Sequence, residues 1–148
     1  MNPSFEVIKW DAMSSSANTP ESVAQAFVRA INRQDGVAAA DLMSPGHRFV
    51  DSLGSVTEGP EKMREGWKAY FRMVPDYAVA IEETYVGGPV VVMLGVAQGT
   101  YSRDGQLHPE NLWQTPVAIR ALIEDGLVAE WRVYADNEPI RKVMARAK

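Results

Sequence analysis

The sequence predicts an α+β fold, in which a curved antiparallel or mixed sheet carries about three helices on its concave face. Segments with a helical period fill the first half of the chain, and apolar runs separated by turn residues fill the second half. The clearest turn is Asp125-Gly126, because both residues tolerate the positive φ of a two-residue hairpin loop. We expect residues 19–148 to form a single domain. Residues 1–18 are expected to be an extension that is poorly ordered or packs on a neighbour.

Two long segments have the apolar period of amphipathic helices. The first follows Thr19-Pro20, because threonine is a good N-cap and the first helical position tolerates proline. The second is expected between Pro60 and Pro75. Between them, the sequence predicts a short helix that ends before Ser44-Pro45-Gly46, and then a short strand over residues 47–52.

The second half of the chain is expected to form β-strands. Tyr77–Val86 and Val90–Tyr101 flank a turn at Gly87-Gly88-Pro89, and the Asp125-Gly126 hairpin follows. Residues 137–148 are expected to form only a short tail.

The register of this hairpin assigns side chains to the two sheet faces. With a two-residue loop, Arg120 would pair with Trp131 and Ala118 with Val133, all on one face. We expect this face to line a cavity. The other face would carry an apolar patch that a monomer would seldom expose, so we expect a homodimer through it. This patch comprises Val117, Ile119, Ala121, Ile123, Val128 and Tyr134.

Composition argues against several classes of function. The net charge of −4 gives no reason to expect binding to nucleic acid or to an anionic membrane. There is no cysteine for a thiolate nucleophile or a zinc–sulfur site, and two histidines are few for a histidine metal site. No apolar run approaches the ~18 residues of a membrane span. We therefore expect a cytoplasmic protein that works without metal or cofactor.

Asp51 is the leading candidate for a catalytic group. On a short strand beside Phe49, it is expected to point into the cavity, where a carboxylate could take a proton from carbon or activate water. The alternative is an aspartate satisfied by backbone amides at a turn. Arg120, next to Trp131 in the predicted register, would stabilise charge, or else lie near the cavity mouth with its guanidinium in water.

Two motifs, together with the order of elements, resemble a known family. Glu58–Trp67 reads EGPEKMREGW at the start of the second long helix, and Glu130–Asp136 reads EWRVYAD in the last strand. From Thr19 to Met144, the chain resembles the SnoaL-like members of the nuclear-transport-factor-2-like superfamily. The resemblance implies a cone-shaped, cystatin-like α+β barrel with a deep apolar cavity, usually dimeric through the outer sheet face. The superfamily includes isomerases, cyclases, epoxide hydrolases, dehydratases and proteins that only bind, so the fold alone selects no function.

Two catalytic branches can be compared residue by residue. Phe49–Ser55 resembles the segment of ketosteroid isomerases that holds the general base, and Asp51 falls on that base. Their oxyanion-hole positions correspond to Phe27 and Ala118, which carry no donor, although one such donor is worth about 3–4 kcal/mol. The Asp-Arg-Asp set of limonene epoxide hydrolases falls on Ala97, Gly95 and Val133. The resemblance thus implies a cavity but argues against both mechanisms.

We therefore expect cofactor-independent acid–base chemistry, of the isomerase, cyclase, hydrolase or lyase class, on an apolar carbonyl-bearing or cyclic small molecule. Asp51 would be the base and Arg120 the charge stabiliser. The expected cavity walls are Phe27, Phe49, Trp67, Tyr70, Met93, Trp113, Ala118, Trp131 and Val133. Two alternatives stay open: a protein that binds an apolar ligand without changing it, and a dimeric scaffold whose interior is filled by side chains.

Overall fold

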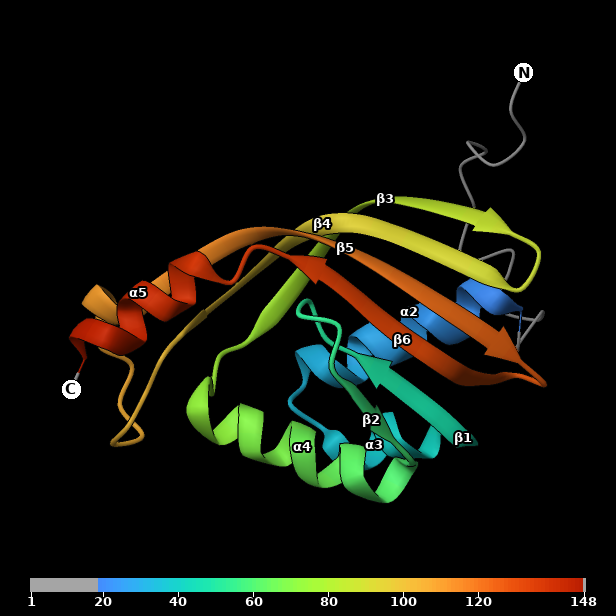
Figure 1. The fold of residues 1–148 in the computed structure, drawn as a ribbon, viewed down its shortest axis with the longest axis horizontal. Coiled ribbons are helices and arrows are strands. Elements are labelled where there is room, and N and C mark those ends of the chain that lie inside the picture. Colours follow the sequence, from blue (N-terminus) through green and yellow to red (C-terminus); the bar gives the residue numbers. More distant parts are fainter. Residues whose placement is uncertain (1–18, 148) are drawn as a thin grey trace.

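A curved six-stranded sheet with helices on its concave side forms the fold (Figure 1). The computed structural model describes residues 19–147, so the predicted extension over residues 1–18 lies outside the described residues. The strands are β1 (Met43–Val50), β2 (Val56–Glu58), β3 (Ala78–Gly87), β4 (Val90–Thr100), β5 (Leu112–Glu124) and β6 (Leu127–Ala135). Their order is β2-β1-β6-β5-β4-β3. Neighbours are antiparallel, except that β1 runs parallel to β6. The predicted α+β class is confirmed.

Helices cover the concave face and one end of the sheet. They are α2 (Pro20–Asn32), α3 (Gly36–Asp41), α4 (Pro60–Met73) and α5 (Glu138–Arg146), with a 3-10 turn η2 (Pro109–Asn111) before β5. As the sequence predicts, Thr19 caps α2, since its side-chain oxygen accepts a hydrogen bond from the Ser22 amide at 3.1 Å. None of the helices in residues 19–147 is long and apolar enough to cross a membrane.

Two segments differ from the sequence-based expectation. The expected tail forms α5 instead, because its apolar stripe is anchored by Val143, which is 3% exposed. The expected break at Ser44-Pro45-Gly46 lies within β1. The pairing of β1 with β6 is irregular between Met43 and Arg48, so the ladder does not need the amide hydrogen that proline lacks.

The predicted turn forms, but the predicted hairpin register is wrong. Asp125 and Gly126 have φ values of 54° and 75°. Pairing begins as expected at the turn, and then a bulge shifts it by one residue. Ala129 of β6 is the extra residue: Val128 pairs with Ile123, but the partner of Leu122 is Glu130 rather than Ala129.

The bulge exchanges the predicted faces of β5, because a one-residue slip moves every side chain of one strand to the other face relative to its partner. Beyond the bulge, Trp131 and Val133 of β6 keep their predicted inward direction, and their partners are Ala121 and Ile119. Arg120 pairs with Arg132, and Ala118 with Tyr134, so both predicted cavity residues lie on the outer, convex face. Most of the predicted dimer patch faces the helices instead, and only its member Tyr134 stays on the outer face. Five of its six members are buried in the core: Val117, Ile119, Ala121, Ile123 and Val128.

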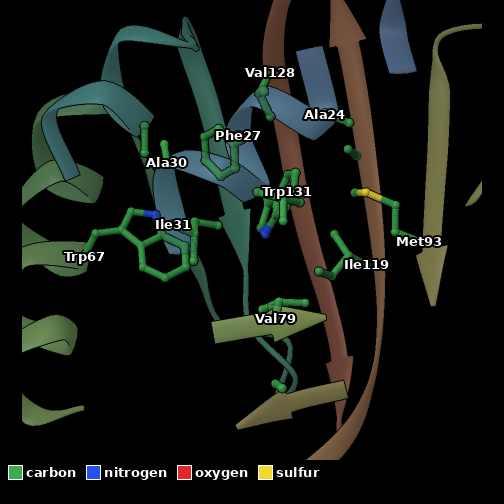
Figure 2. Close-up of a cluster of buried hydrophobic side chains, with 14 of the residues drawn as sticks. Ala24, Phe27, Ala30, Ile31, Trp67, Val79, Met93, Ile119, Val128 and Trp131 are labelled. Atoms are coloured by element: carbon green, nitrogen blue, oxygen red, sulfur yellow. The ribbon is translucent and has the colours of Figure 1, made fainter. Parts of the chain in front are cut away.

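The core lies between α2 and the concave face of the sheet (Figure 2). Phe27 of α2 packs against Trp131 of β6 with ring centroids 4.4 Å apart. Met93 of β4 and Val128 of β6 are fully buried in the same cluster. Burial of each such side chain stabilises the fold by about 1.5–3 kcal/mol.

Gly95 allows β3 to approach β4 closely. Opposite it, β3 has an irregularity between Ile81 and Glu83. A Cβ atom at Gly95 would lie 1.9 Å from the carbonyl oxygen of Ala80, which is a backbone atom that cannot rotate away. This position therefore requires glycine.

Replacement of this glycine tests the packing of β3 on β4. Gly95→Ala should lower the free energy of unfolding by about 1–3 kcal/mol, because β3 must move to admit the methyl group. The matched control is Gly87→Ala at the end of β3, where an added Cβ meets nothing within 4 Å. Chemical denaturation measures both variants. If Gly95→Ala were as stable as the parent protein, the close approach would be refuted.

Candidate functional site

A cavity of about 380 Å³ lies between α4, the concave face of the sheet and the start of α5. This volume is within the range of about 300–1,000 Å³ that is typical of small-molecule sites. Apolar side chains from five elements supply much of the lining: Met63 of α4, Ala97 of β4, Val117 of β5, Val133 and Ala135 of β6, and Ile140 of α5. The cavity is thus bounded mainly by regular elements, which hold their side chains in place.

Five aromatic residues that line the cavity form a connected series, which we call the aromatic arc: Phe49, Trp67, Tyr70, Tyr77 and Trp113. Successive ring centroids along the arc are 5.8, 6.3, 5.0 and 6.1 Å apart. The first three pairs meet at 73°, 87° and 87°, the edge-to-face geometry that aromatic pairs favour. Rings at such steep angles enclose space instead of stacking into a column.

Both acidic residues of the cavity lie on one rim, made by Asp51-Ser52 after β1 and Asp136-Asn137 after β6. Because β1 and β6 are parallel neighbours, both segments leave the sheet at the same edge. The side-chain amide of Asn137 donates a hydrogen bond to the Ser52 hydroxyl at 2.7 Å. This bond ties the two segments together, so that two carboxylates share one rim.

One oxygen of Asp51 is held by the turn that follows β1. Its Oδ1 accepts hydrogen bonds from the amides of Leu53 and Ser55, both at 2.9 Å. No hydrogen bond from residues 19–147 reaches Oδ2. The alternative raised by the sequence, an aspartate satisfied by backbone amides at a turn, thus holds for Oδ1. The second oxygen, Oδ2, is free to contact a ligand.

Asp136 is the second rim carboxylate, and the sequence analysis did not select it. Its Oδ1 accepts from the Glu138 amide at 2.9 Å, which orients the start of α5. Its backbone oxygen accepts from the Thr115 hydroxyl at 2.9 Å. The parallel pairing of β1 with β6 brings Asp136 to Asp51, and no local sequence pattern encodes that pairing.

The cavity has an acidic rim and a neutral interior. Asp51 and Asp136 are its acidic lining residues, and no basic side chain is among the lining residues that the structure describes. Burial raises the pKa of Tyr77 to about 12. Burial, and to a smaller extent the nearby Tyr77, also raises the pKa of Tyr70. Both hydroxyls are therefore protonated at neutral pH and can donate hydrogen bonds.

The predicted site residues divide into three groups. Asp51 and five predicted wall residues line the cavity: Phe49, Trp67, Tyr70, Trp113 and Val133. Three others are packed in the core with at most 1% of their surface exposed: Phe27, Met93 and Trp131. Two lie on the outer face: Ala118 and Arg120. Within residues 19–147, no group of three or more acidic or histidine side chains is arranged to hold a metal ion.

Arg120 belongs to a charged cluster on the outer face, which we call the arginine cluster: Arg48, Arg120, Arg132 and Glu130. Glu130 is 8% exposed and lies 3.2–3.3 Å from all three guanidinium groups. The predicted contact of Arg120 with Trp131 is wrong, because the β6 bulge puts them on opposite faces.

Tyrosine ionisation tests the environment of the aromatic arc. Unfolded tyrosine ionises near pH 10, whereas Tyr77 keeps its proton to about pH 12. The folded state therefore holds more protons between these pH values, so stability is full below pH 10 and is lost as the pH rises towards 12. A spectrophotometric titration of the folded protein should show a late phase that Tyr77→Phe reduces. Ionisation of all tyrosines in one step near pH 10, with the fold intact, would contradict this.

Comparison with known proteins adds a family match. Residues 24–131 match the model of the SnoaL-like domain. No curated protein matches the chain.

Three solved structures illustrate the shared fold. An uncharacterised cystatin-fold protein from Novosphingobium aromaticivorans is 24% identical, with 79% of this chain and 97% of that chain covered and a TM-score of 0.67. A protein with a ketosteroid isomerase-like fold from Catenulispora acidiphila, in complex with trimethylamine, is 20% identical, with 82% and 91% covered and a TM-score of 0.70. An LEH-like epoxide hydrolase from M. tuberculosis is 16% identical, with 88% and 92% covered and a TM-score of 0.72.

Proposed function

Because this chain belongs to the SnoaL-like domain family, we propose that its cavity binds an apolar small molecule and that Asp51 performs cofactor-independent acid–base chemistry on it. The structural relatives include an epoxide hydrolase, so the fold is one that supports catalysis. Their low identity supports only this general point, and the specific reaction is argued from the residues of this chain.

The observation that carries the proposal is the position of Asp51 on the cavity rim. Two backbone amides hold one oxygen in place, which fixes the direction of the other. A fixed carboxylate oxygen beside an apolar cavity can accept a proton from a bound carbon acid or from water. Held in this way, the base needs no rearrangement when the substrate enters.

Neutral donors of the aromatic arc take the stabilising role that the sequence analysis gave to Arg120. The hydroxyls of Tyr70 and Tyr77 keep their protons well above neutral pH. The indole N–H of Trp113 is buried without a hydrogen-bond partner in residues 19–147. A substrate oxygen that gains negative charge would be stabilised by such donors, because hydrogen bonds from buried groups are stronger than those in water.

The second candidate function is binding without chemistry. It is favoured by the engagement of Asp51 Oδ1 in the turn, which gives this residue a structural role whether or not it reacts. Both functions require an occupied cavity, and they differ in whether removal of one carboxylate abolishes turnover.

Asp51→Asn separates these functions. Asparagine keeps an oxygen that the Leu53 and Ser55 amides can use, so the turn should persist while the base is lost. Loss of a general base typically costs 10²- to 10⁴-fold in rate. We expect exchange of α-protons for deuterium in a panel of cyclic and aryl ketones, followed by NMR in D₂O, to fall by at least about 100-fold. The affinity of Asp51→Asn for the same ketones should differ from that of the parent protein by no more than a few-fold.

The matched control is Asp41→Asn, which removes the same charge from an exposed position on α3. It should leave the exchange rate unchanged. Undiminished exchange in Asp51→Asn would rule out the base. Binding of the ketones without exchange in the parent protein would favour the second candidate function.

We also propose a homodimer through the outer face of β4 and β5. This face differs from the patch that the sequence predicted. Paired positions carry apolar side chains that are partly exposed: Val92, Leu94, Val96, Ala118 and Leu122. Together with the arginine cluster beside them, they form a mixed apolar and charged surface of the kind that suits subunit contact.

Leu94→Lys tests the dimer, because a lysine at the middle of this apolar surface would be desolvated on association. Sedimentation of the parent protein at micromolar concentration should give a dimer, and the variant should be largely monomeric. The control is Val37→Lys on α3, at a position that is 57% exposed and away from the sheet. A parent protein that sediments only as a monomer would exclude the interface.

A further inference from the structure

We infer that the ligand of this cavity carries a cationic nitrogen, a protonated amine or a quaternary ammonium, on an apolar body. The inference rests on the proposed function, since it names the ligand class of the same cavity. Two independent features support it: the aromatic arc and the unbalanced charge of the rim.

The aromatic arc has the chemistry of an ammonium-binding cage. The faces of tryptophan and tyrosine rings carry negative electrostatic potential and attract cations within about 6 Å of the ring centre. Four of the five arc residues are tryptophan or tyrosine, and adjacent rings meet at up to 87°. Such rings can surround a methylated nitrogen on several sides, whereas a flat stack would offer a single face.

The rim supplies negative charge without a counter-ion. Asp51 and Asp136 both line the cavity, and the Asn137–Ser52 hydrogen bond keeps their segments together. Two arginines on the helices that border the cavity are paired elsewhere: Arg64 of α4 with Glu61, and Arg141 of α5 with Glu138, both at 3.0 Å on the surface. Among residues 19–147, neither rim carboxylate forms an ion pair, and their side-chain hydrogen bonds come from backbone amides.

The sign of the ligand's charge is inferred from these unpaired rim carboxylates. An anionic ligand would meet two like charges and no compensating cation. A neutral ligand that closed the rim would remove water from the carboxylates and give no ionic partner in return. A cationic ligand would pair its charge with the rim carboxylates and pack its N-alkyl groups against the aromatic arc. Its apolar body would fill the remaining volume of the cavity.

Matched probes test the inference. Phenyltrimethylammonium and tert-butylbenzene have nearly the same shape and differ in one positive charge, and benzoate provides the anion. We expect the cation to bind about tenfold more tightly than its neutral analogue, and benzoate to bind more weakly than either. Binding can be followed by NMR shifts of the indole N–H signals. Equal affinity for cation and neutral analogue, or preference for benzoate, would overturn the inference.

The double variant Asp51→Asn/Asp136→Asn assigns the preference to the rim. It should bring the affinities of the cation and tert-butylbenzene to within about threefold, without weakening the binding of tert-butylbenzene. Asp41→Asn, the charge-matched control, should keep the full preference. A full cation preference in the double variant would remove the rim from the explanation and contradict the inference.

The two proposals fail on different results. If Asp51→Asn abolishes proton exchange but the parent protein does not discriminate the probes, only the ligand class is wrong. If the parent protein prefers the cation but Asp51→Asn exchanges protons normally, only the role of Asp51 as base is wrong. High salt should reduce the cation preference in the parent protein, because screening weakens the attraction of the rim.

Discussion

The placement of β6 is the constraint on which both the core and the candidate site depend. It pairs in parallel with β1 and in antiparallel fashion with β5. The parallel pairing brings the ends of β1 and β6 to one edge, where Asp51 and Asp136 form the rim. The bulge at Ala129 turns Trp131 into the core and Arg132 outwards. Without that one inserted residue, Trp131 would share a face with Arg120 instead of with Ala121.

This placement separates charge across the sheet. The arginine cluster occupies the convex face around Glu130, whereas the cavity on the other side of the sheet carries only carboxylates. This separation is energetically favourable, because arginines on the concave face would lose their water beneath the helices and find no carboxylate partners in the apolar core. The same sequence can therefore offer one surface suited to a subunit and a cavity suited to a small molecule.

Much of the fold was predictable because it is encoded locally. The cap at Thr19, the Asp125-Gly126 turn and the period of the first long helix each depend on neighbouring residues. The bulge was not predictable, because Ala129 gives no local signal for an inserted residue. Because of this one inserted residue, the sequence predicted the wrong face for Arg120 and Ala118. Residues predicted from the helix period, such as Trp67 and Tyr70, do line the cavity. Asp136 was missed because its position depends on a pairing between distant segments.

A crystal structure of the protein with phenyltrimethylammonium bound is the most direct measurement of whether this cavity is a ligand site. We expect density for the probe between the aromatic arc and the rim, with its nitrogen closer to Asp51 and Asp136 than to any arginine. Density only on the outer face, or a cavity closed by rearranged side chains, would contradict that expectation. Such a result would leave the SnoaL-like fold intact and remove the site that we assign to it.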